Sequence, residues 1–160
     1  MLPRAFEARA LLLSGRSEEC LDLSLGPHAV IRAMCLSDQG RVTEAVAIVD
    51  SVAGLVREND SADTVFTHVT RAEDLASYYA RLGDVVQTNT WLLDAFTRSP
   101  TGIDVFVLES QLFSQVRDDP AFFTNVAGAR ALIWSRVQDA SRAVDLVPPF
   151  GLRNYPSPAP

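Results

Sequence analysis

Lysine is absent from this sequence, because all 14 of its basic residues are arginine. That absence excludes Schiff-base catalysis and the phosphate-binding lysine of P-loop enzymes. Histidine and cysteine occur twice each, without the CxxC or HxxxH spacing that is typical of zinc sites. No uncharged apolar run approaches the about 18 residues that a membrane-spanning helix needs. Metal chemistry, nucleotide binding and a membrane span are therefore not predicted, and we expect no cofactor.

The charge balance argues against nucleic acid as a partner. The 160 residues include 20 acidic and 14 basic side chains, for a net charge of −6, which is unfavourable for gripping a phosphate backbone. The apolar run Ala10–Leu13 is too short for a signal peptide. Cys20 and Cys35 lie 15 residues apart without a CxxC pattern, so we expect both to be reduced, small buried hydrophobic residues in a cytoplasmic protein.

Helical periodicity dominates what is present. Apolar residues recur every three or four positions over 42–56, 65–82, 86–96 and 126–144, as in amphipathic helices. The segment Ile103–Leu108 is β-branched and apolar, but Thr101 and Asp104 resemble a capping box, so we predict a helix there too. No segment alternates with a period of two. The predicted fold class is therefore all-α.

Glycine and proline separate the helical stretches. Gly15, Gly40 and Gly83 each lie between two apolar stripes, and Asp119-Pro120 has the pattern of an N-cap followed by the first helical residue. Residues 148–160 contain five prolines, which forbid a helix and favour extended geometry. The sequence thus predicts one helical domain over 1–147 and a Pro-rich tail over 148–160, which is either a loose end or a ligand for a groove.

A helix–glycine–helix pattern that recurs along a chain is typical of helical repeats. The best window surrounds Gly83 and has small or apolar residues at the packing positions of a repeat: Leu75, Ala76, Tyr79, Leu92 and Ala95, with Pro100 as the stop. This window resembles the tetratricopeptide (TPR) repeat. A degenerate copy surrounds Gly40 and a truncated one surrounds Gly15, so the resemblance covers about residues 4–101.

The next segment resembles the unit that closes TPR arrays in bacterial multi-domain regulators. Its matching residues are Phe113, Val116, Arg117, Asp119, Pro120 and Phe122. The resemblance implies a right-handed α-solenoid of antiparallel helix pairs with a C-terminal capping helix. It also implies a bacterial scaffold or signalling module, and a groove lined by the first helix of each pair.

In the best repeat, the groove positions resemble Thr70, Glu73, Ser77 and Arg81. We add Arg32 as a second candidate for an acidic partner, and Tyr78 as a groove residue beside a core Tyr79. The predicted site is thus a partner-binding groove formed by Arg32, Thr70, Glu73, Ser77, Tyr78 and Arg81.

Catalysis has little support in the sequence. His28 and His68 lack a metal-binding context, and the paired carboxylates are adjacent in sequence, so they do not converge on a helix. We therefore predict a non-catalytic protein–protein interaction module that binds another protein or a peptide. Two alternatives are a small-ligand or peptide sensing domain of a bacterial regulator, and a homo-oligomerisation module that pairs through an apolar face around Leu2, Phe6 and Leu12.

Overall fold

Every secondary-structure element that the structure describes is a helix. The computed structural model describes residues 4–23, 29–58, 65–98 and 111–143, so the predicted all-α class is confirmed for these ranges. In chain order the elements are α1 (Arg4–Leu13), α2 (Ser17–Leu23), α3 (Ala29–Asp38), α4 (Val42–Glu58), α5 (Val65–Arg81), α6 (Val85–Arg98), the 3₁₀ turn η3 (Gln111–Phe113) and α8 (Pro120–Ala143). None of these helices combines the length and apolar character that crossing a membrane requires.

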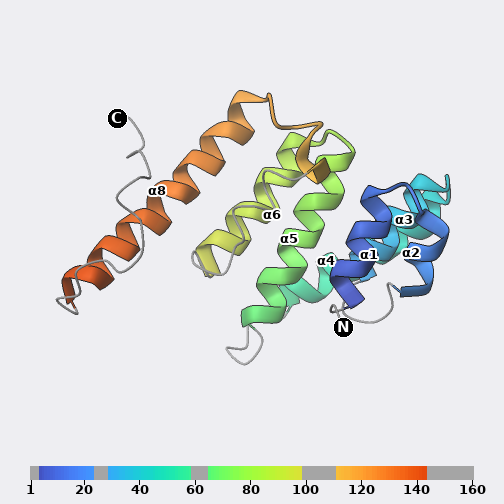
Figure 1. Ribbon diagram of the computed structural model, residues 1–160, viewed down its shortest axis with the longest axis horizontal. Helices are drawn as coiled ribbons and strands as arrows, with labels where there is room; N and C mark the ends of the chain where they lie inside the picture. The colour runs from blue at the N-terminus through green and yellow to red at the C-terminus, as the bar shows by residue number, and fades with distance from the viewer. Residues whose placement is uncertain (1–3, 24–28, 59–64, 99–110, 144–160) are drawn as a thin grey trace.

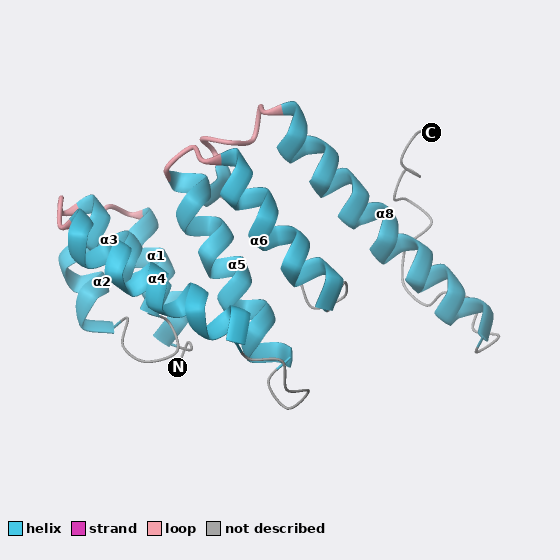
Figure 2. Ribbon diagram, turned by 180° about the vertical axis from the view of Figure 1, so that it is seen from behind, coloured by secondary structure: helices cyan, strands magenta, loops and turns pink. Residues whose placement is uncertain are grey.

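The helices pack mainly against their neighbours in sequence. The strongest pairings are α1 with α2, α3 with α4 and α5 with α6, and α8 packs against α6. Both α3 and α4 also contact α5, which joins the second pair to the third. Figures 1 and 2 show helices α1–α4 gathered at one end, α5 and α6 in the middle, and α8 at the opposite end.

The same glycine turn closes α1, α3 and α5. Gly15, Gly40 and Gly83 have φ angles of 75°, 75° and 74°, in the left-handed region that side chains with a Cβ rarely adopt. In each turn the glycine N–H donates to the carbonyl three residues back, and the next N–H donates five residues back. This pair of hydrogen bonds is the Schellman motif, which satisfies the last carbonyls of a helix.

The residue after each glycine directly precedes the next helix. Arg16 and Arg41 each form an ion pair with a glutamate three residues later, Glu19 and Glu44. At the third turn Asp84 takes this place, and its Oδ1 accepts the Gln87 N–H at 3.0 Å as an N-cap. The three turns therefore share one backbone conformation, followed by an Arg–Glu ion pair at the first two turns and by an Asp N-cap at the third.

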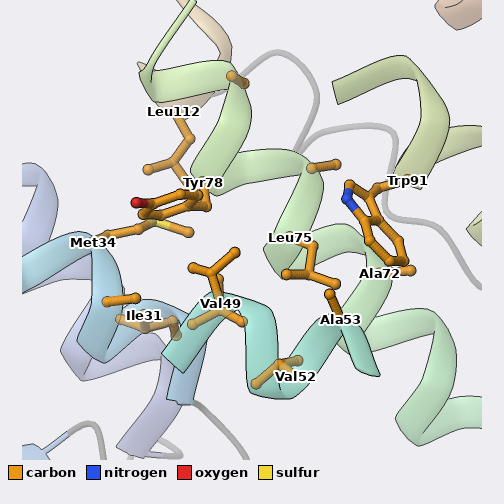
Figure 3. Packing of buried hydrophobic residues seen from close by; sticks show 14 of the residues in the cluster. Ile31, Met34, Val49, Val52, Ala53, Ala72, Leu75, Tyr78, Trp91 and Leu112 are labelled. Carbon is orange, nitrogen blue, oxygen red and sulfur yellow. The ribbon is translucent and has the colours of Figure 1, made fainter. Parts of the chain in front are cut away.

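The core includes four of the five packing positions that the repeat frame predicted, whereas Val42, Val86 and Leu93 of the periodic stripes are exposed. Leu75, Ala76, Leu92 and Ala95 are all fully buried. Figure 3 shows Leu75 of α5 close to Ala53 of α4. The small residues allow close approach of the helix axes, and the larger ones fill the spaces between them.

The N-terminus of α8 also agrees with the sequence. The helix begins at Pro120, and Oδ1 of Asp119 accepts the Ala121 N–H at 2.8 Å. Phe122 is buried and stacks on Phe113, with ring centroids 5.6 Å apart. The predicted N-cap is confirmed, and Phe122 belongs to the core.

The prediction of reduced cysteines is wrong. Cys20 of α2 and Cys35 of α3 form a disulfide, with Cα atoms 6.3 Å apart and both residues fully buried. The expected burial is confirmed, but the pairing depends on two helices lying side by side, which their spacing in sequence does not reveal. The prediction of a cytoplasmic location rested partly on reduced cysteines. Because disulfides are typical of oxidising compartments, the cysteines no longer support that prediction.

Several predictions fall outside the described residues. These are the helix over Ile103–Leu108, the Pro-rich tail at 148–160 with the domain boundary before it, and His28. His68 belongs to α5, but its side chain is also outside the described part.

Candidate functional site

The predicted groove face of α5 is mostly turned into the protein. Ser77 is fully buried, and its hydroxyl donates to the Glu73 carbonyl oxygen at 2.9 Å. Glu73 is also buried, and Thr70 is half-buried with a partner inside the molecule. Glu73 and Ser77 are therefore not accessible to a partner in this conformation, because α5 is covered by its neighbours instead of lining an open surface.

Tyr78, predicted to face the groove, is more deeply buried than Tyr79, which was predicted to lie in the core. Tyr78 is only 3% exposed, whereas Tyr79 is partly buried at the edge of the core. Figure 3 shows the Tyr78 ring beside Met34 of α3. Burial is the main reason that the pKa of Tyr79 is raised, and the Asp50 carboxylate adds to it. The repeat frame placed Tyr79 in the core, but contacts between α5 and α3 select Tyr78 instead.

The two predicted arginines serve internal contacts. Arg32 Nη1 donates to the Leu21 carbonyl oxygen at 3.2 Å and so ties α3 to α2. Arg81 forms an ion pair with Asp38 at 2.5 Å and so ties the end of α5 to the end of α3. Neither guanidinium is left unpaired for an acidic partner.

Two of the predicted residues do share a small pocket. Tyr78 and Arg81 line a depression of about 140 Å³ between α3 and α5, beside Ser37 and Asp38. The other four predicted residues, Arg32, Thr70, Glu73 and Ser77, do not contribute to it. The Asp38–Arg81 ion pair already neutralises its charge, so this pocket lacks a free cation.

A larger, open pocket lies between residues of α3, α4 and α5. Its volume is about 370 Å³, and it is lined by Ala29, Ala47, Ile48, Ser51, Val52, Leu55 and Arg71. Its volume falls in the range of about 300–1,000 Å³ that ligand sites occupy. Val52 belongs to the predicted apolar stripe over 42–56, but none of these residues was predicted to bind a ligand, although Arg71 directly follows the predicted groove residue Thr70.

A long-range ion pair joins the first helix pair to the third. Arg9 of α1 pairs with Asp74 of α5, whose side chain is 1% exposed. The two residues are 65 positions apart, so no local pattern could have linked them. The pair fixes α1 against α5 and stabilises the buried charge of Asp74.

An apolar stripe remains exposed on α6. Val86 and Leu93 are 72% and 63% exposed and lie seven residues apart, on one face of the helix; Leu82, in the turn before α6, is also exposed. Phe123 at the beginning of α8 is exposed as well. Large apolar side chains gathered on one exposed face are typical of interaction surfaces.

The described residues contain no group of three or more His, Cys, Asp or Glu side chains arranged to hold a metal ion. The pKa values of Glu19 and Glu44 are lowered because each carboxylate accepts hydrogen bonds from its arginine. Both pairs are exposed beside the glycine turns, which suits a role in starting α2 and α4.

No protein-family model, curated protein or solved structure matches this chain. The resemblance to the TPR repeat therefore stays a prediction, and the all-helical fold is what the structure itself establishes for the described residues.

Proposed function

We propose that this chain is a non-catalytic protein–protein interaction module built as a TPR-like solenoid of three helix pairs. The three identical glycine turns support this assignment, since stacked helix pairs with a repeated turn are the building principle of such arrays. Signalling in a bacterial cell would be the biological setting that the resemblance implies.

The exposed stripe of α6 is the observation that carries the proposal. The predicted groove residues of α5 are engaged internally, so the binding surface moves to Leu82, Val86 and Leu93. An apolar stripe on a rigid helix can receive the apolar face of a partner helix or segment, with selectivity from neighbouring polar side chains.

The test is affinity purification with quantitative mass spectrometry on a charged double variant, Val86→Glu with Leu93→Glu. The matched control is Val42→Glu with Val46→Glu, which places the same charges at two exposed valines of α4. Circular dichroism confirms that both variants fold. We expect the wild type and the α4 variant to retain the same partners, and the α6 variant to lose them.

Identical partner profiles for all three proteins would refute the α6 surface as the binding site. Size-exclusion chromatography with light scattering distinguishes self-association from binding to a different protein. A wild-type dimer that becomes monomeric in the α6 variant would assign the stripe to homo-oligomerisation instead of binding to a foreign protein.

A further inference from the structure

Arg71 differs from the other arginines whose side chains the structure describes. Five of these pair with carboxylates, namely Arg9, Arg16, Arg41, Arg81 and Arg98. Arg32 donates to a backbone carbonyl, Arg57 lies over the Trp91 ring, and Arg117 has a partner as well. Among the described residues, none forms an ion pair or a hydrogen bond with the Arg71 side chain, although the chain has 20 acidic and 14 basic residues.

Arg71 lies at the larger of the two pockets described above. It is half-buried and forms part of the wall of the 370 Å³ pocket, whose other lining residues are uncharged. Ala47, Ser51 and Leu55 follow one another at four-residue spacing on α4 and form one side of the pocket. Small side chains at 47 and 51 leave the hollow, and Ile48 and Leu55 supply apolar area.

We propose that this pocket binds a small amphiphilic carboxylate, such as a medium-chain fatty acid, with its apolar body against α4 and its carboxylate on Arg71. The guanidinium is a planar fork of donors that matches a carboxylate with two parallel hydrogen bonds. The apolar walls favour a ligand with hydrocarbon surface, and one cation among uncharged residues selects a single negative charge. This ligand site is independent of the protein-binding stripe on α6, because the two use different helices.

The probe is decanoate, titrated into the full-length protein and followed by ¹H–¹⁵N NMR. Decyltrimethylammonium, which has a matching hydrocarbon chain and the opposite charge, is the parallel probe. We expect decanoate to shift the amides of Ala47, Ser51 and Arg71, and the cation to bind much more weakly. Equal binding of the two probes would refute the role of charge.

Two variants and one control test separately whether binding needs the Arg71 charge and whether it needs the pocket volume. Arg71→Gln should weaken decanoate binding about tenfold, since a hydrogen bond to a charged group is lost. Arg41→Gln removes the same charge from a surface ion pair and should leave binding unchanged. Ala47→Leu fills the pocket from an exposed helical position and should weaken binding while Arg71 remains.

Unchanged decanoate binding in Arg71→Gln or in Ala47→Leu would overturn the proposal. A peptide is the competing occupant, tested with a capped peptide that carries leucine beside aspartate. If that peptide binds in an Arg71-dependent way and decanoate does not, the free-acid proposal is wrong and the pocket belongs to a protein partner.

Discussion

The first helix pair and the third are closed by the same turn but are held in place differently. Helices α5 and α6 have 17 and 14 residues and form much of the core through fully buried side chains such as Leu75 and Leu92. Helices α1 and α2 have only 10 and 7 residues. The first pair is joined to the rest by the Cys20–Cys35 disulfide and the Arg9–Asp74 ion pair.

The difference follows from how much apolar area a short helix can bury. Stability from hydrophobic burial scales with area, and a seven-residue helix offers little of it. A covalent link and a buried ion pair therefore supplement packing where the helices are short. We expect substitutions in the third pair to lower the stability of the whole fold, and substitutions in the first pair to act mainly at the N-terminal end.

The largest effect is expected from Leu75→Ala. Leu75 is fully buried where α5 meets α4, so the change removes methyl groups and leaves a cavity at the centre of the fold. The free energy of unfolding should fall by roughly 4 kcal/mol, towards the upper part of the Leu→Ala range. Urea denaturation measures it, with exposed Leu93→Ala as the control. Equal losses for the two variants would contradict the central place of the third pair.

The disulfide should rank second. Replacing both cysteines, Cys20→Ala with Cys35→Ala, removes a cross-link between residues 15 positions apart. The expected loss is about 3 kcal/mol, because the unfolded chain regains the entropy that the link removed. Amide exchange should rise more in α1 and α2 than in α5 and α6. The control is the wild-type protein unfolded in the presence of a reductant, which should also be less stable. An unfolding midpoint that is the same with and without the reductant would contradict the prediction.

The helices could be predicted from local sequence patterns. The burial and pairing of the candidate site residues could not, because they depend on contacts between residues distant in sequence. The predicted stripe over 42–56 lies within α4, and Asp119-Pro120 begins α8, because periodicity and capping act within a few residues. The burial of Tyr78 depends on α3, and the disulfide depends on where α2 meets α3. Arg71 has no local signature either, since its pocket is formed by three helices. The groove therefore stays a prediction: the repeat frame assigns a face to α5, but the neighbouring helices determine which face is exposed, and they bury Ser77 and Tyr78.

A smaller effect is expected for the ion pair that joins the two regions. Arg9→Met leaves the Asp74 carboxylate buried without its partner and should cost about 2 kcal/mol, below the range for fully buried pairs because Arg9 is partly exposed. Arg9→Met combined with Asp74→Asn should recover part of the loss. The control is Arg98→Met, whose pair with Asp94 is more exposed. A loss no larger than that of Arg98→Met would show that the ion pair does not anchor α1.

The smallest effect concerns the turn between α1 and α2, and it depends on pH. Hydrogen bonds from Arg16 lower the pKa of Glu19 below its ordinary value of 4.5, so the folded state favours the ionised carboxylate. A lowered folded pKa gives stability that is present above the unfolded pKa and is lost as the pH falls through the folded value.

Glu19→Gln should therefore destabilise the protein slightly at pH 7, and the difference from the wild type should disappear in acid, once both states are protonated. Glu18→Gln is the matched control, since it also lies in the first turn of α2. Urea denaturation at neutral and acidic pH measures both variants. At the third turn, Asp84 caps α6 through a backbone N–H without an arginine, so no such arginine-dependent effect is expected there. If Glu18→Gln and Glu19→Gln depended on pH in the same way, the Arg16 pair would add nothing beyond the general preference of a helix N-terminus for negative charge.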